Sequence, residues 1–261
     1  MTIRQGFMIE GDANPAKSFA FAAEHGFEFV ELNMENGFQR ARIDTDRIHT
    51  SAVEYGLDLV VHLPYGVDVA SPHEHARRGA RREMAAAMET AAAMDVKKGV
   101  FHARSFAKPD AWDLEWVRDL IFESVDEVSA AGPAVFEACA ENLKGPFVDA
   151  SDFPAIFERT DATVCLDTGH AYATGYDGAW QADLIRKHGD RISHLHLNDT
   201  RRDDNDKHLP VGMGQIDFTV IARALRETEW AGTCTHELYS FGHDYAAHGK
   251  ATSDRLLGSE A

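Results

Sequence analysis

The sequence predicts a single (β/α)8 TIM barrel, and three observations lead to this prediction. Short runs of apolar and β-branched residues alternate along the chain with amphipathic stretches long enough for helices. Eight such runs occur, and 261 residues is a usual length for one barrel of this kind. Regular alternation of strand and helix produces parallel strands, and eight of them close into a barrel. We therefore expect one domain over residues 1–261.

The elements follow from the same pattern. In chain order, the predicted strands cover residues 4–9, 27–33, 57–62, 98–102, 134–140, 163–167, 192–197 and 233–238. The helical stretches between them include 14–25, 44–55, 72–94, 112–131 and 218–228. Their Ala-rich and charged faces suit an outer ring of helices. The polar tail over 243–261 is expected to be only partly ordered.

The charge balance is strongly acidic. The formal net charge of -17, from 43 acidic and 26 basic residues, disfavours a dedicated nucleic-acid binder because phosphates repel such a surface. However, the chain has 18 Arg against 8 Lys, and 24 of its acids are Asp. This composition resembles that of proteins from a high-salt cytoplasm. In such proteins the net charge reflects the habitat of the organism more than the binding partner of the protein.

The chain shows no pattern of a membrane or secreted protein. It has no run of eighteen apolar residues, and its start, MTIRQGFMIEGD, lacks the charged segment and apolar run of a signal peptide. We therefore expect a cytoplasmic protein without a membrane partner. Cys139, Cys165 and Cys234 each lie in an apolar run, which indicates buried small side chains rather than disulfides or thiolate ligands.

Most of the predicted strands end on, or next to, a residue that can bind a metal ion. These residues are His62, His102, Glu141, Asp167, His196 and Glu237. His, Asp and Glu together make up about a fifth of the chain, so their presence at six of eight strand ends exceeds chance. In a barrel these ends converge on one face, which is the face that carries the active site.

Two local motifs add further ligands. In Asp167-Thr168-Gly169-His170, the glycine permits a tight turn that returns an imidazole beside the carboxylate. In Asp206-Lys207-His208, alternate residues of a loop point a carboxylate and an imidazole the same way. With the strand ends, these motifs bring the candidate metal ligands to nine.

The mixture of ligands indicates which metal and how many ions. Imidazoles and carboxylates without thiolate suit zinc, manganese or iron, and five His with four carboxylates favour zinc or manganese over magnesium. Nine ligands exceed what one ion needs. Two or three ions that share bridging carboxylates fit better, and such clusters clamp a phosphoryl group or activate a water.

The motif series resembles that of the endonuclease IV and xylose isomerase-like barrel superfamily. The series is HLPY, FH, EN, LDTGH, HLND, DKHLPVGMGQIDF and HE, and it runs from His62 to Glu237. Carried over residue by residue, the endonuclease IV pattern implies a three-zinc cluster on His62, His102, Glu141, Asp167, His170, His196, Asp206, His208 and Glu237. The sugar-isomerising and epimerising branch resembles this chain at the ligands of one ion, Glu141, Asp167, His196 and Glu237.

The chain departs from the DNA-cleaving branch at two places. The segment GFMIEGDANP lacks the Gly-Gly of DNA-cleaving members, and HARSF replaces their HPG after the second histidine. Conversely, Tyr65 matches a tyrosine that DNA-cleaving members place beside the lesion, although many other relatives share it.

Two enzymatic functions therefore stay open. In a sugar or sugar-phosphate isomerase or epimerase, Glu141 and Glu237 would move protons at a metal-chelated substrate, and His170 would hold its hydroxyls or phosphate. In a phosphodiesterase resembling endonuclease IV, acting at abasic DNA, both glutamates would be ligands. A metal-bound sugar-binding module is a third, non-enzymatic alternative. The acidic surface and the N-terminal departure narrowly favour the isomerase class, and the sequence leaves substrate and oligomeric state open.

Overall fold

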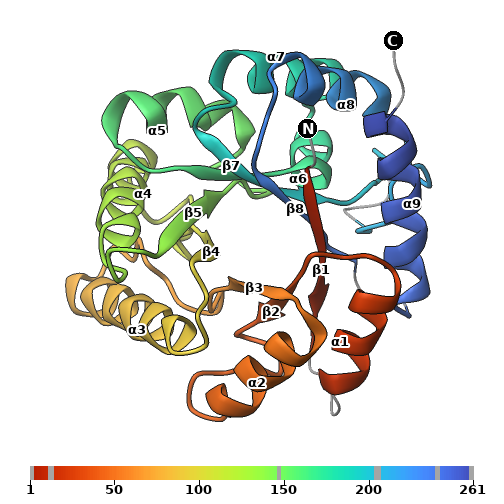
Figure 1. The fold of residues 1–261 in the computed structure, drawn as a ribbon. Coiled ribbons are helices and arrows are strands. Elements are labelled where there is room, and N and C mark those ends of the chain that lie inside the picture. Colours follow the sequence, from red (N-terminus) through yellow and green to blue (C-terminus); the bar gives the residue numbers. More distant parts are fainter. Residues whose placement is uncertain (1–2, 11–14, 146–147, 203–206, 239–241, 259–261) are drawn as a thin grey trace.

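A computed structural model gives the structure of the chain and describes residues 3–10, 15–145, 148–202, 207–238 and 242–258. Within these residues, eight strands form a closed barrel in the order β1 to β8. Every pairing is parallel, including that of β8 with β1, which closes the barrel. The helices surround the strands as an outer ring (Figure 1). The predicted fold class is confirmed.

The strands lie where the apolar runs predict them. They are β1 (Arg4–Ile9), β2 (Phe29–Asn33), β3 (Asp58–His62), β4 (Lys98–His102), β5 (Glu137–Glu141), β6 (Val164–Asp167), β7 (Ile192–Leu197) and β8 (Thr233–His236). Their register determines which side chains meet at the strand ends. His102 pairs with Glu141 across β4 and β5, and Asp167 pairs with His196 across β6 and β7.

The helices begin mostly at aspartates. They are α1 (Pro15–Glu24), α2 (Thr45–Tyr55), α3 (Glu74–Ala92), α4 (Leu114–Ser129), the 3-10 turn η1 (Ala150–Asp152), α5 (Phe153–Arg159), α6 (Thr168–Ala173), α7 (Gly178–His188), α8 (Phe218–Glu227) and α9 (Asp244–Gly258). Asp44, Asp113, Asp177 and Asp217 each accept a backbone N–H of the helix that follows. Such N-caps satisfy donors that a helix cannot satisfy itself.

The C-terminal segment, which is expected to be only partly ordered, includes a helix. Residues 244–258 form the fifteen-residue helix α9, which packs beside α8 and closes the outer ring (Figure 1). Small residues make this close packing possible: a Cβ at Gly249 would lie 2.9 Å from Nδ1 of His236. His236 accordingly faces the helices, as its place in the strand predicts.

Apolar side chains fill the space between the barrel and its helices, where Phe19, Met84, Met88 and Phe153 are fully buried. All three cysteines are free and buried, as predicted. No helix in the described part of the chain is long and apolar enough to cross a membrane.

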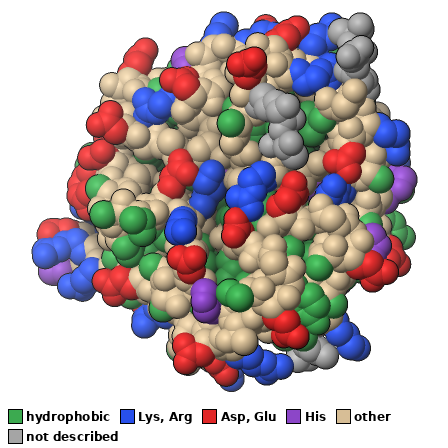
Figure 2. Space-filling model, viewed as in Figure 1, with side chains coloured by type: hydrophobic (Ala, Val, Ile, Leu, Met, Phe, Trp, Pro, Cys, Tyr) green, Lys and Arg blue, Asp and Glu red, His purple; other side chains and the backbone are tan. Residues whose placement is uncertain are grey.

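Figure 2 looks onto the end of the barrel where the strands begin, and there Lys, Arg, Asp and Glu side chains gather around the centre. Ion pairs join the starts of neighbouring strands at this end, as between Lys98 and Glu137 at 3.3 Å. The opposite end, where the strands finish, carries the candidate site.

Candidate metal centre

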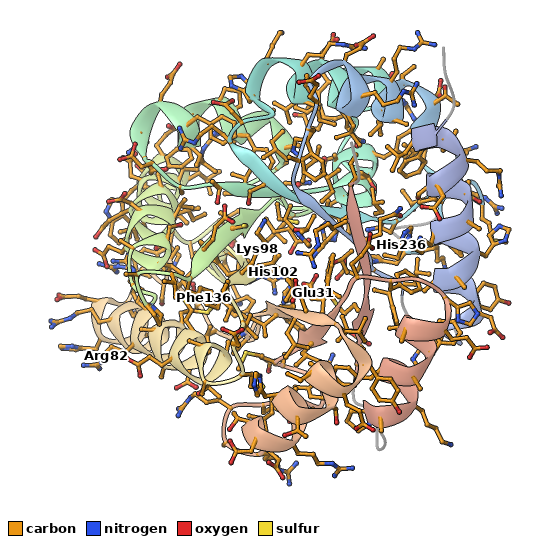
Figure 3. The ribbon with its side chains drawn as sticks, viewed as in Figure 1. Glu31, Arg82, Lys98, His102, Phe136 and His236 are labelled. Carbon is orange, nitrogen blue, oxygen red and sulfur yellow. The ribbon has the colours of Figure 1, made fainter. Side chains whose placement is uncertain are left out.

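The barrel brings together the ligand residues predicted at the strand ends. His62, His102, Glu141 and Asp167 each end a strand, His196 lies one residue before the end of β7, and Glu237 directly follows β8. Nearly all of these side chains are buried, and His102 retains 12% exposure. In Figure 3, His102 and Glu31 point toward the axis of the barrel from β4 and β2, whereas Arg82 points outward from α3.

The Asp167 turn carries its imidazole inward through a helix start. Asp167 caps α6, because its Oδ1 accepts the backbone N–H of His170 at 2.6 Å. This cap places the His170 ring so that its Nδ1 lies 3.7 Å from Asp167 Oδ1. Gly169 is required for space: a Cβ there would lie 1.7 Å from Oδ1 of Asn198. This glycine lies within α6 and packs against Asn198, and so differs from the tight turn that the sequence predicts.

His208 reaches the site from a loop that Asp199 holds in shape. The two oxygens of Asp199 accept backbone N–H groups from Thr200, Gly212, Gly214 and Ile216 at 2.8–3.1 Å. His208 itself has a φ of 47°, a left-handed conformation that is uncommon for residues other than glycine. It is fully buried, with Nδ1 3.4 Å from Oε2 of Glu237. Asp206, the other predicted ligand of this loop, lies outside the described residues.

The ligand atoms form three neighbouring groups, each with donor atoms within 4.8 Å of one another. The groups are His62, His102 and Glu141; Glu141, Asp167, His196 and Glu237; and Asp167, His170 and His208. Glu141 and Asp167 each belong to two groups. A carboxylate shared in this way can bridge two ions, and mixed imidazole and carboxylate donors suit zinc or manganese.

Glu141 illustrates the bridging geometry. Its Oε2 lies 3.3 Å from Nε2 of His62 and 3.0 Å from Nε2 of His102. Its Oε1 lies 3.0 Å from Nδ1 of His196 and 3.6 Å from Nδ1 of His170. The two oxygens therefore face different groups of imidazoles.

The buried charges fit a site for cations. None of Glu141, Asp167 and Glu237 has a Lys or Arg partner among the residues that the structure describes. Burial raises the pKa of Asp167 to about 7, and neighbouring Glu237 adds to this effect. Oε2 of Glu237 is buried and has no hydrogen bond to any residue that the structure describes, although it lies 3.3 Å from Nδ1 of His196. Divalent cations between these carboxylates would offset their mutual repulsion.

Glu31 is a functional candidate that the sequence argument missed. It lies in the middle of β2, is fully buried, and its Oε1 is 3.2 Å from Nε2 of His196. Burial by itself raises the pKa of Glu31, but the charge and hydrogen bonds of His196 and His194 lower it well below its usual range. His196 thus turns Nδ1 to the ligand groups and Nε2 to a carboxylate, which fixes the orientation of the ring.

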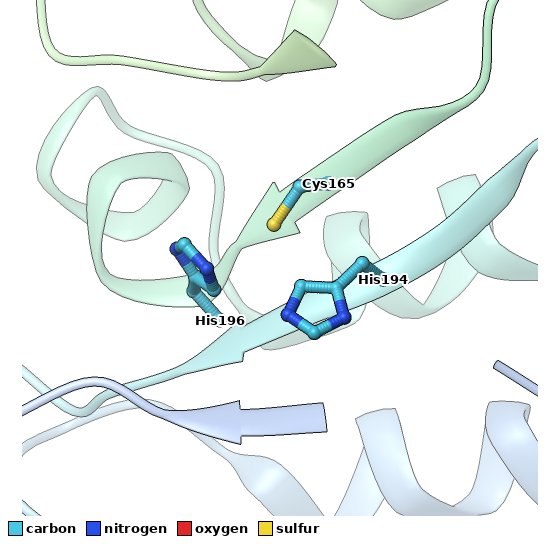
Figure 4. A group of neighbouring side chains, drawn as sticks. All are labelled: Cys165, His194 and His196. Carbon is cyan, nitrogen blue, oxygen red and sulfur yellow. The ribbon is translucent and has the colours of Figure 1, made fainter. Parts of the chain in front are cut away.

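A fourth group of possible ligands consists of Cys165 on β6 and of His194 and His196 on the neighbouring strand β7 (Figure 4). We interpret it as hydrogen-bonded core. His194 contacts Thr233 at 2.6 Å and Thr235 at 3.0 Å, so both of its ring nitrogens have partners. Burial raises the pKa of the Cys165 thiol well above its usual range, which disfavours the thiolate that a metal requires.

Above the ligands lies a cavity of about 400 Å³. Its floor includes His62, His102, His170 and Glu237. One wall consists of Glu10, Asn33, Asn36 and Tyr65, and the opposite wall includes Arg104, Leu143 and Lys144. Apart from Tyr65, none of these wall residues was predicted from the sequence, because they lie at strand ends or in the loops that follow and come together only in the closed barrel.

The fold and the site define a (β/α)8 barrel that gathers imidazoles and carboxylates at the carboxyl ends of its strands. The family model for the xylose isomerase-like TIM barrel matches residues 19–256, and the chain belongs to this family. The resemblance in the motif series is thereby confirmed.

Relatives of two kinds match the chain. The probable endonuclease 4 of Mycobacterium ulcerans (strain Agy99) is 26% identical over 235 residues, which cover 85% of this chain and 90% of the relative. A D-tagatose 3-epimerase-like protein has a TM-score of 0.82 at 21% identity, covering 98% of this chain and 97% of its own. Endonuclease IV from Thermus thermophilus has a TM-score of 0.72 at 21% identity, covering 97% and 98%. The solved structures share the fold with this chain.

Proposed function

We propose that this protein is a hydrolase of phosphate esters that uses two or three divalent metal ions, zinc or manganese. The observation that carries the proposal is the position of Glu141. Both of its carboxylate oxygens face imidazoles, Oε2 toward His62 and His102 and Oε1 toward His196. This geometry suits a bridging ligand between ions, whereas a base in isomerisation needs one oxygen turned toward the substrate.

The ligands divide among the ions as the three groups do. His62, His102 and Glu141 would hold one ion; Glu141, Asp167, His196 and Glu237 a second; and Asp167, His170 and His208 a third. Bound there, divalent ions supply Lewis-acid charge to a phosphoryl group and activate water for attack.

The reaction is the addition of water to an ester. The water oxygen forms a bond to phosphorus, and the bond between phosphorus and the ester oxygen breaks with its electron pair on that oxygen. The proton that the water gives up goes to the departing oxygen, so that the products are an alcohol and a phosphate.

The protein's own residues position the reactants. Glu31 holds the ring of His196 through Nε2, and Asp199 holds the loop of His208. Tyr65 stacks beside His102, with ring centroids 5.5 Å apart, and its hydroxyl accepts a hydrogen bond from Asn36 at 2.7 Å. These contacts fix the floor and one wall of the cavity before a substrate binds, which lowers the cost of orienting it.

The names of the relatives add support, since the probable endonucleases 4 match most of the chain. A second candidate is the sugar or sugar-phosphate isomerase or epimerase that the sequence narrowly favoured. The group of Glu141, Asp167, His196 and Glu237 could hold a single ion with a glutamate on either side of a substrate. The similarity to a D-tagatose 3-epimerase-like protein makes this candidate worth testing in parallel.

One set of assays tests both candidates. Protein loaded with zinc or manganese is incubated with bis(p-nitrophenyl) phosphate, with sugar phosphates, with an abasic-site duplex, and with ketoses in deuterium oxide. We expect metal-dependent release of nitrophenol or phosphate and no deuterium in any sugar. Deuterium incorporation without ester hydrolysis would reject the hydrolase and favour the epimerase.

A variant of Glu237 separates the two roles of that residue. For a ligand in a hydrolytic centre, Glu237→Gln should lose activity in step with metal content, and added zinc or manganese should restore part of it. For a proton-transferring group, turnover should fall about a hundredfold or more at full metal content. Glu54→Gln, the same change on the exposed face of α2, serves as the control.

A further inference from the structure

We propose that Arg104 and Lys144 form a subsite for a second anionic group, so that the substrate is a small phosphorylated polyol with two anionic ends. The inference rests on the proposed function in one respect: the ester phosphate would occupy the metal ligands on the cavity floor. The subsite itself depends on the two walls of the cavity and on a second cavity beside it.

Both cations stand at the junction of two cavities. Arg104 follows His102 by two residues after β4, and Lys144 follows Glu141 by three residues after β5. Together with Leu143 they line the 400 Å³ cavity above the ligands and also an adjoining cavity of about 210 Å³. A molecule that extends from the metal ligands into the second cavity would therefore pass beside residues that line both cavities.

The charge of Arg104 is available to a ligand. Arg104 forms no ion pair with any carboxylate in the described part of the chain, although the chain carries 43 acidic residues. Its guanidinium lies 5.2 Å from the ring centroid of Phe106, which lines the second cavity and is 54% exposed. An arginine stacked on an aromatic ring keeps its planar edge free for an oxyanion.

The opposite wall selects for hydroxyl groups. Nδ2 of Asn33 donates to Oε1 of Glu10 at 3.1 Å, and Nδ2 of Asn36 donates to the hydroxyl of Tyr65. This wall offers donors and acceptors for a polyol, and the Glu10 carboxylate repels an anion. The asymmetry orients the substrate, with its hydroxyls toward β1 and β2 and its second anion toward β4 and β5.

The size of the site favours a small molecule over duplex DNA. The cavity of about 400 Å³ lies in the range of small-ligand sites, and the adjoining cavity of about 210 Å³ extends it. A net charge of -17 opposes the approach of a polyanionic duplex far more than that of a small dianion. Cleavage of an abasic-site duplex in preference to small esters would therefore contradict this substrate class.

Non-hydrolysable probes test the subsite. Alkane bisphosphonates, with linkers from ethane to pentane, carry two anions joined by carbon–phosphorus bonds that the enzyme cannot hydrolyse. Each is compared with the alkylphosphonate of the same length by calorimetric titration of metal-loaded protein. Since a hydrogen bond to a charged group contributes about tenfold or more in affinity, the best bisphosphonate should bind about tenfold or more tighter than its partner.

Variants assign this preference to the two cations. In Arg104→Ala/Lys144→Ala the preference should fall to about twofold, the statistical advantage of two equivalent ends, while metal content and alkylphosphonate affinity stay unchanged. In Arg104→Glu it should reverse, because the new carboxylate repels the second anion. The matched control is Arg82→Ala/Lys187→Ala, which removes the same charges from exposed positions on α3 and α7.

The outcomes separate the subsite from the proposed function. A wild-type protein without the preference, or a preference that survives in Arg104→Ala/Lys144→Ala, would overturn the subsite. An intact preference in a protein that hydrolyses no phosphate ester would overturn the hydrolase and leave the subsite standing.

Discussion

Replacing Glu31 by Gln should weaken metal binding although Glu31 is not itself among the proposed ligands. The carboxylate and the imidazole of His196 are both fully buried, and the gap from Oε1 to Nε2 is 3.2 Å. At an effective dielectric constant of about 20, two unit charges at this distance attract each other by about 5 kcal/mol. Desolvation offsets most of that attraction.

The loss of metal affinity in Glu31→Gln is limited by the hydrogen bond that the new amide can still form. An amide at position 31 could still accept a hydrogen bond from His196, but it would carry no charge to hold the ring or raise its basicity. Loss of such an orienting carboxylate costs about ten- to a hundredfold in metal affinity, which corresponds to about 2 kcal/mol. We therefore expect Glu31→Gln to bind zinc about thirtyfold more weakly than the natural protein.

Competition with a chromophoric chelator measures this affinity, and circular dichroism reports whether the barrel is intact. Glu54→Gln, on the exposed face of α2, should bind zinc as the natural protein does. Zinc affinity within about twofold of the natural value in Glu31→Gln would refute the positioning role. A loss of structure in that variant would be resolved with Thr235→Val, which keeps the Glu31 carboxylate. This change removes the 2.5 Å hydrogen bond from Thr235 to Glu31 and the 3.0 Å contact of Thr235 with His194, and it should show a smaller loss of affinity.

Three further predictions concern the metal site and its supports. Excess chelator should abolish activity and lower the melting temperature, because an ion at a hundred times its dissociation constant stabilises the fold by about 2.7 kcal/mol. Calorimetry with and without added zinc measures this change in melting temperature. Gly169→Ala should destabilise the protein by about 1–3 kcal/mol in urea unfolding, since its Cβ would collide with Asn198, whereas Gly79→Ala in the open middle of α3 should stabilise it by about 0.5–1 kcal/mol. His208→Ala should release one ion per chain by elemental analysis and leave the circular dichroism spectrum unchanged.

The strands and the strand-end ligands could be predicted because each depends on a local pattern. The apolar runs of β4 and β7 are bounded by polar residues on both sides, so that even their ends could be read from the sequence. Once eight parallel strands are predicted, barrel closure alone brings the residues at their carboxyl ends to one face.

Glu31 was not predicted as a functional residue, because a single acidic residue in an apolar strand is typical of the solvent-facing side of a half-buried strand. All five residues of β2 are buried, since the barrel covers one face and the helices the other. An acidic residue within a strand of a predicted parallel barrel is therefore a signal that could have identified it.

The remaining differences come from tertiary packing. Helix α9 is polar in sequence, and it is held in place by small residues, Ala246, Gly249 and Ser253, on the face that packs inward. Arg104 and Lys144 lie 40 residues apart, and only the neighbouring positions of β4 and β5 place them on one wall. Neither the packing of α9 nor the proximity of Arg104 to Lys144 leaves a periodic pattern in the sequence.

The number and position of bound ions test the central claim most directly. Crystals of zinc-loaded protein, measured by anomalous scattering at the zinc edge, would show each ion and its ligands. The bridging arrangement predicts two or three ions, with Glu141 shared between the ion at His62 and His102 and the ion at His196. A single ion on Glu141, Asp167, His196 and Glu237, with His62 and His102 turned away from it, would contradict the metal cluster and with it the proposed hydrolase.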